Sequence, residues 1–582
     1  MYKNGSIKLE LSSPNLYIGN PFKNAESIIK ILKKSKASFV LFAELCLSSY
    51  TAGDLFFENT FLEENLKALD FIINNNSFEG VYIIGMPFCF ESLIYNVAVI
   101  LQKNKILGIV PKQTIPNYKE FSEKRWFQSG KNVQTKFIDF LGQKVPFGNI
   151  LFINQKFDII FGVEICQDLW TIESPSDSLT LNGAHLIFNL SASTEHIGKS
   201  KLRKIAVLDH SRKQMGGYFY TSSGISETST DTLFSNHKIA SVLGKIIGEK
   251  DLFNEDVSLI VDVFVDVIKY QRRIDTTLGD QKIGKEIYFL KSYFDLIEVD
   301  DYIFEKDFKK RPFISKNNLH EDLKIAHVIQ LFSLQNKLSQ IPNIKIFLII
   351  TEELNEFLSL LMIIQIFKKN KKNIKDLNVI LNKKFFSDNN LFFLLKKFLI
   401  NQNININDTD DVFIKKEKNS KFLLLENYNL SNIAIGQKIN KNFNYYCYFD
   451  FFYNLNIGIS NTFMTELILF NLNNDKIFID NDLKKIYLDK IKIFLTNNIL
   501  IEDFILYHYL KNNFNIDKIA FLIKKVFLLN KETSSEIVKK YMKVFFQSQH
   551  KRQSISPGPK IFEYSLSNRI ELKLPVYLDR KE

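Results

Sequence analysis

The segment IIFGVEICQDLW, residues 159–170, is the stretch from which the fold of this chain can be worked out. Its first part, Ile159 to Val163, is short, apolar, and β-branched or aromatic, which predicts a buried strand. Cys166 stands where such a strand would end, and the polar residues Gln167 and Asp168 follow it. A side chain at a strand end can face a pocket while the sheet holds its backbone still, which suits a nucleophile. The alternative interpretation is a buried free cysteine that packs as a small hydrophobic residue.

Strand patterns recur on both sides of this segment, and some are separated by helical spacing. Ile7 to Leu11 alternate like a strand, and Asn24 to Lys34 have the spacing of an amphipathic helix. The other predicted strands are Ser38 to Phe42, Val81 to Gly85, the hairpin Asn96 to Leu101 with Ile106 to Val110, and His185 to Leu190. Strands and helices mixed in this way predict a layered α/β fold.

Polar residues follow four of these strands, namely Glu44, Lys112, Cys166 and Ser193. In open α/β sheets, ligand sites collect outside the strand ends. A carboxylate there can take the proton of a thiol and return it to a leaving amine, and a lysine can stabilise a thiolate and an oxyanion. Each residue also has a simpler interpretation, because Glu44 could cap a helix, Lys112 could be exposed in a loop, and Ser193 could be a helix N-cap. Three separate structural roles for Glu44, Lys112 and Ser193, together with Cys166, are a less economical explanation than one shared site.

Composition excludes several classes of function. The 582 residues are enough for two to four domains, and the net charge of +12 comes from lysines scattered without an aromatic-interleaved basic motif, so no nucleic-acid binding is expected. The four cysteines lack CxxC spacing and the eight histidines form no ligand pairs, so we expect no metal site and a cytoplasmic protein. The N-terminus has no apolar signal region. The most apolar stretch, Ile344 to Phe367, contains three glutamates and does not predict a membrane span.

Six ordered blocks of the sequence resemble the glutamine-dependent NAD⁺ synthetase family. Four of them resemble the signature blocks of its nitrilase-like glutaminase domain: FAELCLSSYTAGDL (42–55), PKQTIPNYKEFSEKRWFQSG (111–130), GVEICQDLW (162–170) and NLSASTEHIGKSKLR (189–203). The flanking blocks are IYNVAVILQKNKILGIVPK (94–112) and SSGISETSTDTLFSNHKIASVLGK (222–245). A short cysteine motif would be weak evidence, but six blocks in order are specific.

The resemblance implies a four-layer α-β-β-α sandwich over residues 1–270. It also implies hydrolysis of glutamine to glutamate and ammonia through a γ-glutamyl thioester, with no metal. Carried over by position, Glu44 is the general base, Lys112 the oxyanion-side lysine and Cys166 the nucleophile. The positions that hold glutamine in the family correspond to Tyr118, Ser193 and Lys199, and Glu123 matches a supporting carboxylate.

The second half begins after a charged, aromatic connector at residues 271–315. Helical spacing at Leu323 to Lys337 predicts an amphipathic helix whose buried face consists of Ile325, Val328, Ile329 and Phe332. A predicted strand at Ile344 to Ile350 and a helix at Leu354 to Phe367 follow. A strand, a short loop and a helix have the geometry of a phosphate-binding turn.

The family carries the sequence SGGLDS at this turn, where it cradles the pyrophosphate of ATP. Here the corresponding sequence is IITEELNE (349–356), which lacks both glycines. Side chains with Cβ atoms keep the backbone away from a pyrophosphate. Glu352 and Glu353 place carboxylates at the helix N-terminus, and each opposes a phosphate ~4 Å away by ~4 kcal/mol at an effective dielectric constant of ~20. The sequence predicts that this loop does not bind ATP in the family's manner.

Two later blocks resemble the synthetase domain of the family. FLLLENYNLSNIAIG (422–436) resembles its strand followed by an NKSE helix, with Asn432 in place of the glutamate. The tail FFQSQHKRQSISPGPKIFEYSLSNRIELKLP (545–575) resembles its C-terminal block and makes Lys551 a candidate for binding deamido-NAD⁺. The resemblance implies a degenerate Rossmann-like domain of the adenine nucleotide alpha hydrolase type over residues 316–582.

Three functions remain open from the sequence. The first is a glutamine-dependent NAD⁺ synthetase that takes glutamine, deamido-NAD⁺, and ATP with Mg²⁺ as cosubstrates, and the family resemblance further implies a homo-oligomer. The second is a glutaminase or amidase whose synthetase domain has become a structural cover. The third is a non-catalytic scaffold, against which the complete set of glutamine-side residues counts.

Overall fold

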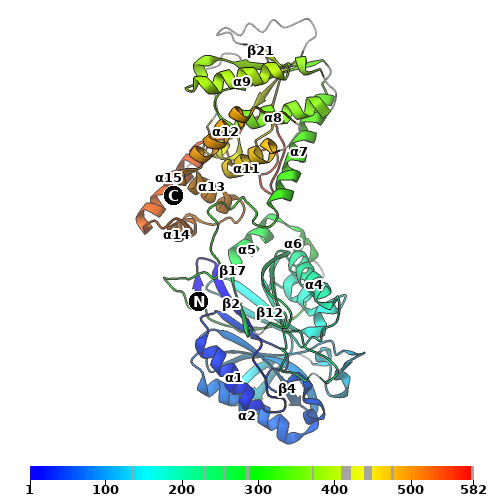
Figure 1. The fold of residues 1–582 in the computed structure, drawn as a ribbon. Helices are drawn as coiled ribbons and strands as arrows, with labels where there is room; N and C mark the ends of the chain where they lie inside the picture. Colours follow the sequence, from blue (N-terminus) through cyan, green and yellow to red (C-terminus); the bar gives the residue numbers. More distant parts are fainter. Residues whose placement is uncertain are drawn as a thin grey trace. The chain divides into compact units, whose positions relative to one another are not determined.

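We describe the protein from a computed structural model, in which the chain divides into two compact units, Met1–Asp307 and Phe308–Glu582 (Figure 1). The described residues are 1–133, 136–228, 230–254, 256–282, 287–341, 343–369, 373–407, 421–437, 449–473 and 477–577.

In its described residues, the first unit contains two large sheets and a short pair, β7 (Asn117–Tyr118) with β8 (Phe121–Ser122). The first sheet is made of β1 (Tyr2–Lys3), β2 (Ser6–Ser12), β3 (Phe39–Phe42), β4 (Val81–Phe90), β5 (Leu93–Gln102), β6 (Lys105–Pro111), β9 (Lys136–Phe140), β10 (Gln143–Phe147) and β17 (Ser258–Phe264). Its order is β1-β2-β3-β4-β5-β6-β10-β9, and β17 pairs with β2.

The second sheet has the order β16-β15-β14-β13-β12-β11-β18. Its strands are β11 (Ile150–Asn154), β12 (Ile159–Ile165), β13 (Leu186–Ser191), β14 (Gly217–Ser222), β15 (Lys238–Val242), β16 (Lys245–Lys250) and β18 (Leu290–Tyr293). β12, β13 and β14 run parallel to one another. Residues 271–307, which the sequence pattern assigned mainly to a connector, lie in the first unit, where β18 pairs with β11.

The two sheets pack face to face, and helices cover their outer faces (Figure 1). Phe39 and Leu41 from one sheet and Phe161 and Phe188 from the other share one buried core. α1 (Pro21–Lys34) and α2 (Asn59–Asn75) cover the first sheet, and α3 (Pro175–Leu181) and α4 (Lys199–Lys213) cover the second. The unit closes with α5 (Val265–Ile274) and α6 (Thr277–Gln281). The predicted α-β-β-α sandwich is confirmed.

The second unit is built on a parallel sheet with the order β21-β20-β19-β22-β23. Its strands are β19 (Ile344–Ile350), β20 (Leu377–Leu381), β21 (Asn405–Asn407), β22 (Lys421–Glu426) and β23 (Phe451–Asn454). The chain moves outward from β19 in one direction and then from β22 in the other, which is the doubly wound pattern of Rossmann-like folds. The predicted fold class is confirmed here too.

Helices make up the rest of the second unit. They are α7 (Leu319–Ser339), α8 (Leu354–Lys369), α9 (Asn389–Asn401), α10 (Leu430–Ala434), α11 (Asn461–Leu472), α12 (Asn481–Phe494), α13 (Asn497–Leu510), α14 (Ile516–Phe527), α15 (Lys531–Gln547) and α16 (Gln549–Arg552). Across the described part of the chain, none of the helices combines the length and the apolar character that crossing a bilayer requires.

The predicted buried face of α7 is wrong. Ile325 and Phe332 are 52% and 51% exposed, whereas Leu334 and Leu338 are buried. α7 has apolar residues at helical spacing on two faces, and periodicity alone cannot decide which face meets the core. α7 contacts α8 and α11, and those contacts bury the face with Leu334 and Leu338.

Candidate functional site

Glu44, Lys112 and Cys166 follow the ends of β3, β6 and β12, and the structure brings them together. Lys112 Nζ donates to Glu44 Oε1 over 2.6 Å, and both side chains are completely buried. The Cys166 thiol lies close enough for the charges of Glu44 and Lys112 to shift its pKa, and the residue is 8% exposed. An acid, an amine and a thiol from distant parts of the chain therefore share one buried pocket.

Two carboxylates share the lysine. Lys112 Nζ also donates to Glu123, at 2.7 Å from Oε1 and 2.8 Å from Oε2. Tyr50 donates to Glu123 Oε1 and Asn96 Nδ2 to Glu44 Oε1, each over 2.8 Å. The second carboxylate oxygen of Glu44, Oε2, is buried and lacks a hydrogen-bond partner among the described residues. A buried carboxylate oxygen without a donor is costly, so Oε2 is available to take a proton from an incoming group.

The electrostatics of the pocket keep the resting thiol protonated. Burial and, to a smaller extent, the Glu44 carboxylate raise the pKa of Cys166 to about 12, against the opposing charge of Lys112. Burial alone would lower the pKa of Lys112, but the Glu123 and Glu44 carboxylates outweigh it and raise that pKa, so the ammonium stays charged. Burial also raises the pKa of Glu123. A nucleophile in this state needs an adjacent base.

The backbone around Cys166 is fixed in an uncommon conformation. Cys166 has a φ of +47°, in the left-handed region that non-glycine residues rarely adopt. Asp168 holds this turn, because its Oδ2 accepts from Ile165 N at 3.1 Å and its Oδ1 from Thr114 N at 2.8 Å. The same carboxylate thus links the cysteine turn to the loop that follows Lys112.

The Glu44 segment lies directly against β4. A Cβ atom at Gly85 would collide with the Leu45 nitrogen and would lie 2.9 Å from the Ala43 oxygen. Only glycine permits this close approach of two backbones. Gly85 therefore sets the depth at which Glu44 enters the pocket.

The residues predicted to hold glutamine lie around the same thiol. Tyr118 donates to Gln167 Oε1 over 2.8 Å and is 48% exposed, and Lys199 Nζ donates to Thr194 Oγ1 over 3.0 Å. Burial raises the pKa of Tyr118 and lowers that of Lys199, and both groups lie near enough to Cys166 that a thiolate there would raise both pKa values. Ser193 is buried beyond the end of β13.

Sequence reasoning missed several residues that support this pocket, namely Tyr50, Asn96, Asp168 and Arg203. Asn96 carried a usable signal, because a polar residue inside an apolar strand must find a partner when it is buried. Tyr50 and Arg203 carried none, since their partners come from distant segments.

In the second unit, a carboxylate in the first turn of α8 accepts a hydrogen bond from a backbone amide of the loop after β19. Thr351 N donates to the Glu356 carboxylate, which is 1% exposed, while Glu352 pairs with Lys490 at 3.3 Å. Burial raises the pKa of Glu356 to about 8, and its Oε1 lacks a partner among the described residues, as suits a protonated carboxyl. The residues of this loop do not fit the phosphates of ATP, because a carboxyl takes up the amide and two more acids flank it.

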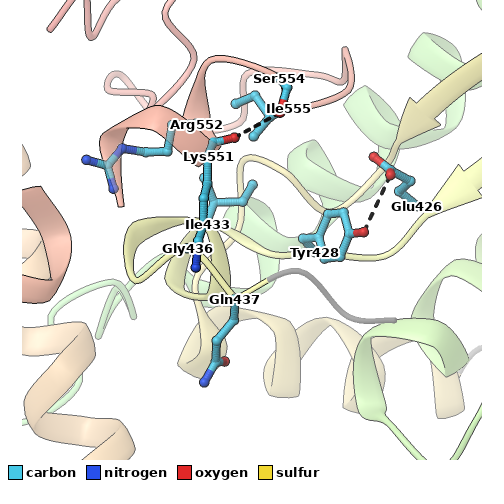
Figure 2. Close-up of a pocket in the computed structure, with 9 residues that line it drawn as sticks. All are labelled: Glu426, Tyr428, Ile433, Gly436, Gln437, Lys551, Arg552, Ser554 and Ile555. Atoms are coloured by element: carbon cyan, nitrogen blue, oxygen red, sulfur yellow. Dashed lines mark hydrogen bonds between the residues drawn. The ribbon is translucent and has the colours of Figure 1, made fainter. Parts of the chain in front are cut away.

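Lys551 lines a small pocket in the second unit (Figure 2). Its aliphatic chain passes over Gly436, whose φ of +67° and lack of a side chain make room for it. The other lining residues are Glu426, Tyr428, Ile433, Gln437, Arg552, Ser554 and Ile555. Glu426 ends β22, so this pocket lies at a strand end, as in other doubly wound sheets. Lys551 belongs to a different unit from the glutamine-side residues.

Comparison with known proteins agrees with the first unit's geometry. The sequence model of the carbon-nitrogen hydrolase family matches residues 19–269. The glutamine-dependent NAD(+) synthetase of Mycobacterium tuberculosis (strain ATCC 25618 / H37Rv) is 27% identical over 350 residues, which cover 58% of this chain and 51% of that protein. The protein of the same name from Thermotoga maritima is 29% identical over 268 residues, covering 45% and 40%.

Among solved structures, a glutamine-dependent NAD(+) synthetase from Cytophaga hutchinsonii aligns with 99% of this chain and 98% of that one, at 14% identity and a TM-score of 0.40. The chain spans about half the length of the curated relatives it matches. The resemblance inferred from the six sequence blocks is confirmed: this chain is similar to carbon-nitrogen hydrolases over residues 19–269 and to glutamine-dependent NAD(+) synthetases over about half of its length.

Proposed function

We propose that this protein hydrolyses glutamine at Cys166 and that the ammonia is used to convert deamido-NAD⁺ to NAD⁺ at the expense of ATP. The observation that carries the proposal is the buried Lys112–Glu44 pair beside the thiol, with Glu44 Oε2 lacking a hydrogen-bond partner among the residues that the structure describes. The names of the sequence relatives support the same overall reaction.

In the proposed reaction, Glu44 takes the thiol proton as the sulfur attacks the γ-carbonyl carbon of glutamine. The charge of Lys112 stabilises the oxyanion that forms on the carbonyl oxygen. Glu44 then gives its proton to the leaving nitrogen, the C–N bond breaks, and ammonia departs from a γ-glutamyl thioester. Water, deprotonated by Glu44, hydrolyses the thioester to glutamate and restores the thiol. Tyr118, Ser193 and Lys199 are proposed to hold the glutamine.

A single assay tests the proposal and its rivals. Purified protein receives glutamine, ATP, Mg²⁺ and deamido-NAD⁺, and both glutamate and NAD⁺ are measured. Glutamate together with NAD⁺ supports the full synthetase. Cys166→Ala should abolish glutamate release while leaving NAD⁺ formation from ammonium unchanged. Undiminished glutamate release by that variant would refute the assignment of the nucleophile.

A glutaminase without synthetase activity is the second candidate, and the loop after β19 favours it. Glu356 occupies the Thr351 amide, so no step with ATP is assigned to residues of that loop. Glutamate release from glutamine, with no NAD⁺ formed from either glutamine or ammonium, would establish this candidate. If neither glutamate nor NAD⁺ is formed, the result would point to a non-catalytic scaffold.

The remaining parts of the proposal concern location and assembly. We place the protein in the cytoplasm, since few cysteines in a long chain suit a reducing compartment. We also propose a homo-oligomer, by similarity to the family. Light scattering on the purified protein measures the assembly state, and a mass of one chain, 68.0 kDa, would contradict it.

A further inference from the structure

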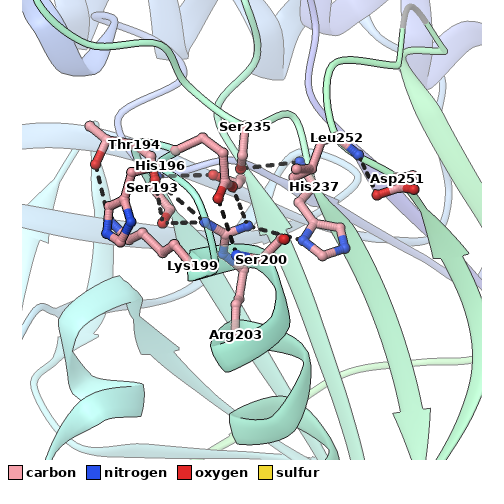
Figure 3. Close-up of polar contacts among 12 residues, drawn as sticks. Ser193, Thr194, His196, Lys199, Ser200, Arg203, Ser235, His237, Asp251 and Leu252 are labelled. Carbon is pink, nitrogen blue, oxygen red and sulfur yellow. Dashed lines mark hydrogen bonds and ion pairs between the residues drawn. The ribbon is translucent and has the colours of Figure 1, made fainter.

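Arg203 lies in α4, and its side chain bonds to residues of the segment that follows β13 (Figure 3). Its side chain is completely buried. Nη2 donates to Ser193 Oγ over 2.9 Å, and Nη1 donates to Glu195 Oε2 over 2.9 Å and lies 3.0 Å from His237 Nδ1. The guanidinium also lies over the ring of Tyr220, 5.9 Å from its centre. These contacts fix both the position and the orientation of the planar group.

The contact with His237 has only one consistent protonation pattern. A guanidinium can only donate, so Nδ1 of His237 accepts and the ring hydrogen is on Nε2. Nε2 faces Glu249 Oε1 at 3.1 Å, which accepts that hydrogen. Burial and the charge of Arg203 lower the pKa of His237, in agreement with a neutral ring. A chain of hydrogen bonds from Arg203 through His237 to Glu249 therefore helps to hold the guanidinium in place.

This arrangement determines how the Ser193 hydroxyl can bond. A hydroxyl has one hydrogen to donate, and Arg203 occupies an acceptor position on its oxygen. In the protein without substrate, this hydroxyl bonds to the Tyr220 side chain, and the contact through which it could donate to Thr194 O is 3.5 Å long, at the limit of hydrogen bonding. The backbone is held too, because Ser193 N donates to Ser222 Oγ over 3.0 Å. The preceding residue, Ala192, bonds through its backbone to the Cys166 sulfur.

We propose that Arg203 is a positioning residue for substrate, which orients the Ser193 hydroxyl as a hydrogen-bond donor to an oxygen of bound glutamine. Arg203 acts through Ser193 and does not itself touch the substrate. The inference rests on the proposed function, in which Ser193 holds glutamine. A purely structural role would limit Arg203 to its pair with Glu195, whose Oε1 accepts from Ser200 N in the first turn of α4.

Calorimetric titration of glutamine into Cys166→Ala protein, which binds without turnover, separates the two roles. Ser193→Ala and Arg203→Lys are added singly and together. Each single change should weaken glutamine binding about tenfold, the cost of one lost hydrogen bond to substrate. The double variant should bind no more weakly than Ser193→Ala alone, because both changes remove the same contact. Arg212→Lys, on the exposed side of the same helix, should bind normally.

If Arg203→Lys fails to fold, Arg203→Met takes its place, because its side chain fills part of the same space and cannot donate to Ser193. The inference is overturned if the two single effects add, if the arginine variants bind glutamine normally, or if the Cys166→Ala protein binds no glutamine. Turnover is measured separately with Cys166 intact, where Arg203→Lys should raise KM about tenfold and leave kcat within about threefold. Absence of glutamate release from the unaltered protein overturns the proposed function, while the calorimetric cycle still decides the role of Arg203.

Discussion

The Cys166 thiol is a weak nucleophile in the resting protein because burial and the nearby Glu44 carboxylate keep it protonated. The same carboxylate is the group that can remove the proton when an amide arrives. Glu44→Gln should therefore lower kcat for glutamate release by about 10²–10⁴, the usual contribution of general base catalysis. The glutamine side chain can still accept from Asn96 and Lys112, so folding is retained. Glu123→Gln is the matched control and should have a smaller effect; an equal loss would contradict the assignment of the base.

Glu44→Gln should raise the alkylation rate of the Cys166 thiol, although it lowers kcat. Because its pKa is near 12, Cys166 should react very slowly with iodoacetamide at pH 7 and progressively faster above pH 9. Glu44→Gln removes a negative charge that raises this pKa, so it should speed alkylation at pH 9 although it slows turnover. Peptide mapping by mass spectrometry distinguishes Cys166 from the exposed Cys89. Slower alkylation in the variant would show that Glu44 does not raise the pKa.

Residue-scale prediction from sequence was limited by partners that only the fold brings together. The strand ends placed Glu44, Lys112 and Cys166 at one edge, because a sheet gathers the residues that follow its strands. The strand ends did not predict that Lys112 is shared between two carboxylates, since Glu123 follows no predicted strand and only the family resemblance indicated it. The role of Arg203 was equally hidden: its basic side chain on a helix would ordinarily point to solvent.

At the scale of elements, β4 and the turn after β3 touch at Gly85. Gly85→Ala inserts a methyl group where the Leu45 nitrogen lies, so one backbone must move. The variant should lower the melting temperature of the first unit by several degrees and lower kcat, because Glu44 shifts with the turn. Gly142→Ala is a suitable comparison, since its added Cβ meets nothing within 4 Å, although its φ of +72° carries its own strain. Equal kcat in wild type and Gly85→Ala would refute the coupling.

The turn between β19 and α8 should make stability depend on pH. Glu356 has its pKa raised from 4.5 to about 8, so between those values the unfolded chain loses the proton while the folded chain keeps it. The free energy of unfolding then falls as pH rises through this window, by up to ~1.4 kcal/mol per pH unit. Glu356→Gln removes the dependence. Its melting temperature relative to wild type should rise by ~5 °C between pH 5 and pH 8 in calorimetry. A difference that stays constant with pH would refute a protonated Glu356.

The positions of strands and helices were easier to predict than which face of a helix is buried. The strands at Ile159 to Val163 and Ile344 to Ile350 were evident because short, fully apolar runs are typical of buried strands. α7 was placed correctly and its buried face was not, since Leu334 and Phe332 lie on opposite sides of one helix and both are apolar.

For the whole molecule, the division into two compact units allows each to be altered separately. Glu356 belongs to the second unit and the Cys166 pocket to the first, each with its own buried core. Glu356→Gln should leave kcat and KM for glutamate release from glutamine within about twofold of wild type. A steady-state assay of the full chain measures both, and a large change would mean that the loop after β19 influences the glutaminase pocket.

Sharing one ammonium between two carboxylates has a consequence for the end of the catalytic cycle. The substrate amide is neutral, but hydrolysis turns it into a third anion beside Glu44 and Glu123, with Lys112 as the single cation bound to both. Product glutamate should therefore be expelled, and its inhibition constant should exceed KM for glutamine at least about tenfold. Inhibition should strengthen at lower pH as Glu123, whose pKa burial raises to about 7, gains a proton, which initial rates at added glutamate will measure. Repulsion by the two carboxylates thus favours release of the product.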